Sequence, residues 1–105
     1  MNEKEFNDLA TATLARIEAG LEQSGADLDF EMLAGGILEV EFADGSKIII
    51  NRHGVAKEIW VAARSGGFHF RYDGEVWRDS RDGSELMAKL VGLLSAQAGE
   101  PVALG

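Results

Sequence analysis

Residues 34–51 have the sequence AGGILEVEFADGSKIIIN and decide the fold class. From Leu38 to Phe42 every second residue is apolar and the residues between are glutamates, the period of a strand with one buried face. Asp44-Gly45 is a strong hairpin signal, and a β-branched run follows at residues 47–51. The stretch therefore predicts two antiparallel strands joined by a tight turn.

Strand patterns continue on both sides of this hairpin. Residues 27–32 alternate acidic and apolar side chains, and Ala34-Gly35-Gly36 permits a tight reversal into the next strand. Three more short segments have strand character and are separated by glycine-containing turns, namely residues 58–63, 68–72 and 75–78. Together they predict an antiparallel sheet of about six strands.

Two helices are predicted, one at each end of the chain. Asn2 and Glu5 form a variant of the capping box, apolar residues recur at helical spacing from Phe6 to Leu21, and Ser24-Gly25 is a stop signal. The second helix is expected to have Asp82 as its N-cap and to end at Ala98-Gly99.

The order of these elements predicts the fold class. A helix, about six antiparallel strands and a second helix favour a two-layer α+β sandwich, with both helices on one face of the sheet. The tail at residues 102–104 is apolar enough to pack back on the domain. No linker or repeat interrupts the pattern, so residues 1–105 are predicted to form one domain.

Composition excludes several classes of function. The chain has no cysteine, which excludes disulfides, thiolate metal sites and thiol catalysis. No apolar run approaches the roughly 20 residues needed to span a bilayer, so no membrane association is expected. The first residues match neither a secretory signal nor an Arg-rich transit peptide, and we therefore expect a cytoplasmic protein.

The net charge of −8 is unevenly distributed. Residues 1–44 contain eleven acidic residues and two basic ones, whereas residues 45–105 contain seven acidic residues and eight basic ones. This argues against nucleic acid as a ligand, because phosphate contacts need clustered Lys and Arg. It favours cations or a basic protein surface as partners. The alternative is that the acids only keep the protein soluble.

Six acidic residues are candidates for a metal site. Asp8, Glu18 and Glu22 fall within an arc of about 80° beside the apolar stripe of the first helix. Asp27, Asp29 and Glu31 follow in the adjoining loop and first strand. Oxygen donors without His or Cys suit hard cations such as Mg²⁺, Ca²⁺, Mn²⁺ and Fe³⁺, and Fe²⁺ acceptably. The alternative is an acidic face that is simply solvated.

Trp60 is a candidate binding residue. Alternation places Ile59 and Val61 on one face of their strand and Trp60 on the charged face with Glu58. Exposed tryptophan is enriched at binding hot spots. The alternatives are that a helix or the tail covers Trp60, or that the two faces are exchanged.

The two histidines, His53 and His69, lack the close spacing of a zinc or iron site. A structural or surface role is therefore expected for both. No serine, histidine and acid constellation of a hydrolase is evident, and the glycine pairs do not precede a helix as a phosphate loop requires.

Several motifs resemble the bacterial frataxin family. Residues 35–42 and 44–52 are similar to the family's central motif, and Ile59-Trp60-Val61-Ala62 and Gly66-Gly67-Phe68-His69-Phe70 continue it in order. Trp77 and the segment Asp79–Gly83 then lead into the last helix, as in the family. The similarity covers essentially the whole chain and is densest in residues 35–83.

This resemblance implies a frataxin-like fold, iron binding on an acidic ridge and a role in iron–sulfur cluster biogenesis. The implied partners are a cysteine desulfurase and the cluster scaffold protein. The implied ligands for weakly held, surface-exposed Fe²⁺ or Fe³⁺ are Asp8, Glu18, Glu22, Asp27, Asp29 and Glu31. The implied partner-binding residues are Glu18, Glu22, Asn51, Arg52 and Trp60, with Asn51 and Arg52 on the same surface as Trp60.

The chain departs from the family pattern at a few positions. His53-Gly54-Val55 stands where the family usually has a glutamine and a proline-containing turn, and Glu58 stands where a glutamine is usual. Ridge positions that are often acidic are neutral at Thr11, Ala19 and Gln23.

Three functions are compatible with these features. The leading one is an iron-binding regulator of cluster assembly, or an iron supplier to it, that is monomeric without iron. The second is a pure interaction module for the desulfurase, with incidental binding of divalent cations. An enzyme that oxidises ferrous iron is the weakest, because the chain lacks the ligand pattern of a buried dinuclear site. We therefore predict a protein that is not an enzyme.

Overall fold

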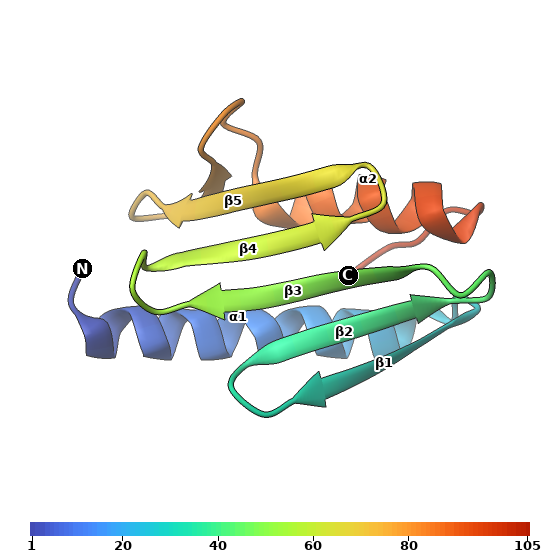
Figure 1. Cartoon of the computed structure of the whole chain (residues 1–105), viewed down its shortest axis with the longest axis horizontal. Coiled ribbons are helices and arrows are strands. Elements are labelled where there is room, and N and C mark those ends of the chain that lie inside the picture. Colours follow the sequence, from blue (N-terminus) through green and yellow to red (C-terminus); the bar gives the residue numbers. More distant parts are fainter.

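Six antiparallel strands form one sheet in which neighbours in sequence are neighbours in space. The computed structural model describes all 105 residues. The elements are α1 (Glu3–Ser24), β1 (Leu28–Leu33), β2 (Ile37–Phe42), β3 (Lys47–His53), β4 (Glu58–Ala63), β5 (Gly66–Tyr72), β6 (Trp77–Asp79) and α2 (Leu86–Ala98). Both helices lie on one face of the sheet, as Figure 1 shows, so the predicted two-layer α+β sandwich is confirmed.

The strand register separates an inner face from an outer face. Val40 pairs with Phe30 on one side and with Ile48 on the other, and these side chains pack in the core. The core is one cluster of 19 buried hydrophobic residues drawn from both helices, β2 to β6 and the tail. The opposite face, which we call the outer face, carries charged side chains and Trp60.

Helix α1 begins and ends as predicted. The Asn2 side chain accepts a hydrogen bond from the Glu5 N–H, and the Glu5 carboxylate accepts one from the Asn2 N–H, which completes the capping box. Gly25 ends the helix with a φ of 67°, in the left-handed region. Neither helix of the chain is both long enough and apolar enough to cross a membrane.

Helix α2 begins later than the sequence predicted. The N-cap is Glu85, whose carboxylate accepts a hydrogen bond from the Met87 N–H at 2.7 Å, so the prediction of Asp82 was wrong. Gly83 has a φ of 74°, a left-handed conformation that interrupts a helix between Asp82 and Leu86. The Asp82 carboxylate instead accepts a hydrogen bond from the Ser84 N–H.

Strand β6 also begins later than predicted. The Asp73 carboxylate accepts hydrogen bonds from the N–H groups of Glu75 and Val76, both at 2.9 Å. These bonds hold residues 73–76 in a turn, so the strand starts at Trp77 and not at Glu75. They also lower the pKa of Asp73 to about 2.

The tail packs against the helices, as predicted. Val102 and Leu104 are buried, and the Val102 N–H donates to the Ser95 hydroxyl at 2.9 Å. The close approach depends on Gly20 of α1, where an added Cβ would lie 2.6 Å from the Leu104 carbonyl oxygen. A glycine in the middle of a helix is therefore explained by the space that the tail needs.

Candidate functional site

Three of the predicted acidic residues lie on α1, outside its buried stripe. Asp8 and Glu22 are exposed and Glu18 is half-buried. Asp8 is paired with Lys4 at 2.7 Å, but both side chains are exposed, so this pair contributes little to stability. Glu18 and Glu22 take part in no salt bridge, which leaves two carboxylates one helical turn apart without a cationic partner.

Four carboxylates lie on the outer face of β1 and β2 as two cross-strand pairs, and we call them the carboxylate quartet: Asp29, Glu31, Glu39 and Glu41. Asp29 pairs directly with Glu41, and Glu31 pairs directly with Glu39. Like charges in direct cross-strand pairs destabilise a sheet. Lys47 of β3 contacts Glu39 at 3.1 Å, and this hydrogen bond and charge raise the pKa of Lys47.

Sequence reasoning named only half of the quartet. Asp29 and Glu31 were predicted, whereas Glu39 and Glu41 were not. The signal was available, because both glutamates alternate with the buried residues of β2 and the short turn at Gly35-Gly36 returns β2 beside β1.

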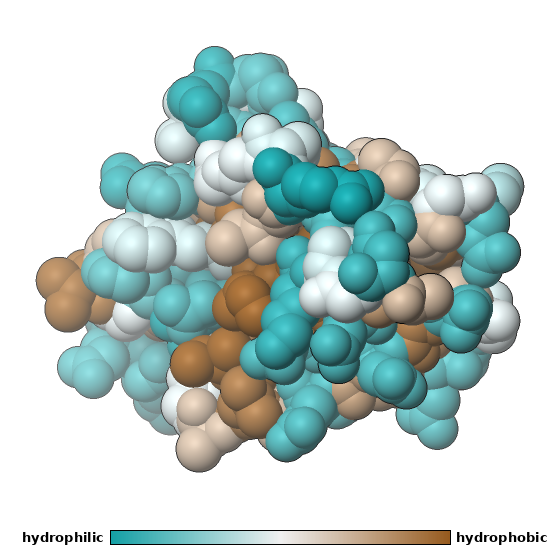
Figure 2. Space-filling view, turned by 45° about the vertical axis from the view of Figure 1, so that its right-hand side comes forward, coloured by the Kyte–Doolittle hydropathy of each residue, from teal (hydrophilic) through white to brown (hydrophobic).

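The acidic residues form an extended surface and not a cage. Asp27 is exposed in the loop between α1 and β1, and the quartet lies on the face of the sheet opposite α1. No three carboxylate or imidazole groups converge as a ready-made metal site. Most of the surface seen in Figure 2 is hydrophilic, with apolar residues gathered in a patch near its centre. We refer to Asp8, Glu18, Glu22, Asp27 and the quartet together as the acidic surface.

Trp60 lies on the outer face of β4, on the side of the sheet that the sequence predicted. Its indole is half-buried because two imidazoles stack on it. The ring centroid of His53 lies 3.8 Å away at an interplanar angle of 11°, and that of His69 lies 4.4 Å away at 9°. Register explains this, since Trp60 pairs directly with His69, and His53 is two residues beyond its other partner, Asn51. Neither a helix nor the tail covers Trp60.

Glu58 holds the indole of Trp60 by its polar edge. The Trp60 Nε1–H donates to Glu58 Oε1 at 2.8 Å, and Arg71 donates to Glu58 Oε2 at 3.0 Å. The Glu58 side chain is only 9% exposed. Burial raises its pKa, but the hydrogen bonds from Trp60 and Arg71 and the charges of Arg71 and His69 outweigh burial and lower the pKa below the ordinary value.

Arg52 does not share the surface of Trp60, so this part of the prediction was wrong. Arg52 pairs with Ile59 on the inner face, and its guanidinium donates to the Asn7 carbonyl oxygen at 2.7 Å and to the Thr11 hydroxyl at 3.0 Å. It ties β3 to α1. Asn51 pairs directly with Trp60 and does lie on the outer face.

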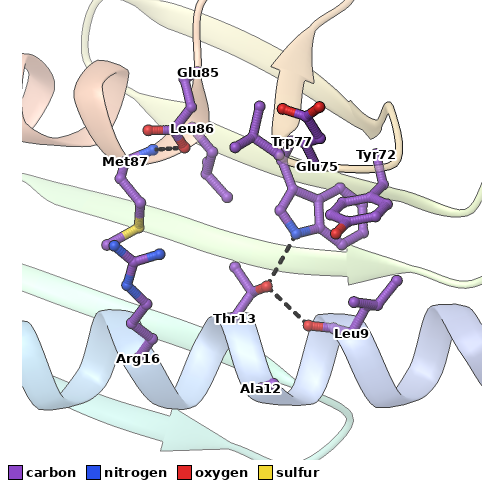
Figure 3. A pocket seen from close by; sticks show the side chains of 11 residues that line it. Leu9, Ala12, Thr13, Arg16, Tyr72, Glu75, Trp77, Glu85, Leu86 and Met87 are labelled. Carbon is purple, nitrogen blue, oxygen red and sulfur yellow. Dashed lines mark hydrogen bonds between the residues drawn. The ribbon is translucent and has the colours of Figure 1, made fainter.

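A small hollow of about 210 Å³ lies between α1, β6 and the start of α2 (Figure 3). At its floor the Trp77 Nε1–H donates to the Thr13 hydroxyl at 2.9 Å, and this hydroxyl donates to the Leu9 carbonyl oxygen at 2.8 Å. Arg16 and Met87 lie at its side. The Thr13 hydroxyl therefore both accepts and donates a hydrogen bond within the fold, and its role is to hold α1 against β6.

A domain profile and several bacterial proteins match the chain over nearly its whole length. The profile of the frataxin-like domain matches residues 1–100. The iron-sulfur cluster assembly protein CyaY of Dechloromonas aromatica strain RCB is 65% identical over 104 residues, which cover 99% of each chain. The protein of the same name from Cupriavidus necator is 52% identical, over 100% of this chain and 97% of the relative.

A solved structure agrees with these sequence similarities. The frataxin of Psychromonas ingrahamii superposes with a TM-score of 0.92 at 34% sequence identity, covering 100% of this chain and 99% of the other. The domain profile, the relatives and the fold agree, so the chain belongs to the frataxin-like family.

Proposed function

We propose that this chain is an iron-binding protein of iron–sulfur cluster assembly. In this role it regulates a cysteine desulfurase and scaffold complex, or supplies iron to it, through the acidic surface. Two kinds of observation support the proposal. Relatives that match the whole chain are named for iron–sulfur cluster assembly. The acidic surface supplies only oxygen donors, which suit hard cations including iron.

The main support for the iron proposal is that few basic side chains lie on the acidic surface. Within the quartet only Glu39 forms a salt bridge, with Lys47, which also pairs across the strands with Glu41; Glu18 and Glu22 form none. Repulsion among these carboxylates raises the free energy of the folded protein, and a bound cation lowers it. Because the carboxylates are exposed or half-buried and do not converge, iron is expected to bind weakly and to exchange quickly.

Docking on the desulfurase would use two parts of the molecule, helix α1 and the outer face of the sheet. Glu18 and Glu22 offer long-range attraction to a basic partner. Asn51 and Trp60 offer short-range contacts on the outer face. Arg52 is assigned the role of holding β3 against α1. We propose no catalytic role for the chain and expect it to act in the cytoplasm, as a monomer without iron.

One observation favours a second function. No three potential ligands converge, so cation binding could be incidental to the protein contact. In that case the acidic surface serves only to attract a basic desulfurase, and the chain regulates cluster synthesis without carrying iron.

Iron titration with and without the desulfurase separates the two functions. We expect Fe²⁺ and Fe³⁺ to broaden the NMR signals of α1 and of β1–β2, and the double variant Glu18→Gln/Glu22→Gln to weaken this effect while remaining folded. Glu75→Gln is the control, because it removes one exposed carboxylate that is not part of the acidic surface. If the double variant titrates like the control, the helix is not an iron site. If the desulfurase abolishes iron binding, the interaction-only function is correct.

A further inference from the structure

The stack of His53, Trp60 and His69 crosses the outer face of three strands, β3, β4 and β5. These strands lie side by side in the sheet (Figure 1). These are the only two histidines of the chain, and both lie against the residue that we assign to partner docking. Histidine is the side chain whose charge ordinarily changes between pH 5 and 8. An imidazole that becomes charged while stacked on an indole gains a cation–π attraction.

The two imidazoles are not equivalent. His53 Nδ1 accepts a hydrogen bond from the Ala56 N–H at 3.2 Å, in the turn between β3 and β4. Protonation of Nδ1 would remove that bond. His69 Nδ1 instead lies 3.9 Å from Glu58 Oε1, and its side chain is 49% exposed. A proton on His69 therefore gains a carboxylate neighbour and remains accessible to solvent.

Several other charged groups lie around His69. Arg71 of β5 is bound to Glu58, and Arg78 of β6 is bound to Asp73 at 2.7 Å. Arg81 lines the same shallow cavity as His69, and its guanidinium donates to the Gly67 carbonyl oxygen. On β4 the facing acid is Glu58, and Lys57 precedes it in the turn between β3 and β4. The arginines oppose a new positive charge, whereas Glu58 and the indole of Trp60 stabilise it.

We propose that His69 is a proton-sensing residue that makes docking through the outer face weaker as pH falls. When His69 is protonated, the ring is held against Trp60 and Glu58, and the patch presents one more positive charge. The added charge disfavours a basic partner, because like charges repel. The proposal rests on the proposed function, since it regulates the same surface.

The free protein provides the first test, because it has two tryptophans and two histidines. In NMR spectra recorded from pH 8 to pH 5, the indole N–H signal of Trp60 should shift together with the imidazole signals of His69. The indole signal of Trp77, which donates to Thr13 inside the fold, should stay constant. In His69→Phe, which keeps an aromatic ring in the stack, the Trp60 shift should be lost. A shift that persists in His69→Phe and disappears in His53→Phe would assign the proton to the other ring.

The second test measures binding to the purified desulfurase at pH 8 and pH 5.5. The Kd of the wild-type chain, relative to that of His69→Phe at the same pH, should rise by about two- to fivefold on going to the lower pH. Because both Kd values are measured at the same pH, their ratio cancels any effect of pH on the desulfurase itself. A constant ratio contradicts the proposal. Absence of binding at both pH values would contradict the proposed docking function instead, while the NMR titration would still decide whether His69 senses pH.

Discussion

At the scale of single residues, the chemistry of the outer face depends on contacts between strands. Trp60 was placed correctly from the alternation of β4 alone. Its stacking on His53 and His69 could not be predicted, because it depends on the register of three strands and on the turn at residues 54–57, where Lys57 has a φ of 54°. The inward position of Arg52 could have been predicted, since Arg52 has the same parity as the buried Ile48 and Ile50.

Glu58 is expected to stabilise the fold only while it is charged. Its pKa is lowered in the folded state, so its contribution is complete above the unfolded value of about 4.3 and is lost as pH falls through the folded value. Glu58→Gln should therefore be less stable than wild type at pH 7 by about 1 kcal/mol.

Urea unfolding of both proteins at a series of pH values measures this difference. The gap between wild type and Glu58→Gln should close as the pH falls below about 4. Glu75→Gln is the control, because the Glu75 carboxylate has no hydrogen-bond partner of its own in the fold. A gap that stays constant down to pH 3 would show that the charge of Glu58 does not stabilise the native state.

At the scale of elements, periodicity and end signals predicted the strands and helices well where the deciding contacts are local. The capping box of α1 and the helix-ending Gly25 and Gly99 are local signals, and all three are confirmed. The start of α2 was missed, because Asp82 fits a cap by type, whereas Gly83 turns the chain away from the helix. Gly20 has no local explanation, since its reason lies 84 residues away at Leu104.

Two glycine substitutions in helices should change stability in opposite directions. Gly20→Ala places a Cβ 2.6 Å from the Leu104 carbonyl oxygen, so the tail must move, and a loss of about 1–3 kcal/mol is expected. Gly92→Ala in α2 meets no atom within 4 Å and should add up to about 1 kcal/mol through helix propensity.

Thermal and urea unfolding of the two variants decide this point. A Gly20→Ala variant as stable as Gly92→Ala would mean that the tail does not pack against α1 as described. Removal of residues 102–105 from the Gly20→Ala variant provides a further check, because without the tail the alanine should no longer be unfavourable.

At the scale of the whole molecule, the uneven charge is the feature that the sequence predicted most directly. The excess of acids in residues 1–44 becomes a surface that includes both α1 and the outer face of β1–β2. Its division between two layers follows from alternation, because Asp29 and Glu31 have the opposite parity to Leu28 and Phe30, which face the core.

Salt and divalent cations are expected to raise the melting temperature. Screening reduces repulsion along the acidic surface, and divalent cations should act at lower concentration because they bind between carboxylates. A relief of about 1 kcal/mol corresponds to roughly 4 °C for a domain of this size. Differential scanning fluorimetry in NaCl and in MgCl₂ measures the effect. The variant Glu31→Gln/Glu41→Gln should respond less than Glu75→Gln, and equal responses would show that the quartet is not under repulsion.

The central claim is that the acidic surface and Trp60 form one docking site for the cysteine desulfurase. Surface plasmon resonance of the wild type and of two variants against the desulfurase, at two salt concentrations, tests it most directly. The double variant Glu18→Lys/Glu22→Lys should associate more slowly, and its association rate should depend less on salt.

Trp60→Ala should chiefly raise the dissociation rate, with a loss of about 2 kcal/mol, and should leave iron binding nearly intact because an indole supplies no ligand for iron. A folded Trp60→Ala variant that leaves the desulfurase at the wild-type rate would contradict the claim that the outer face is part of the interface.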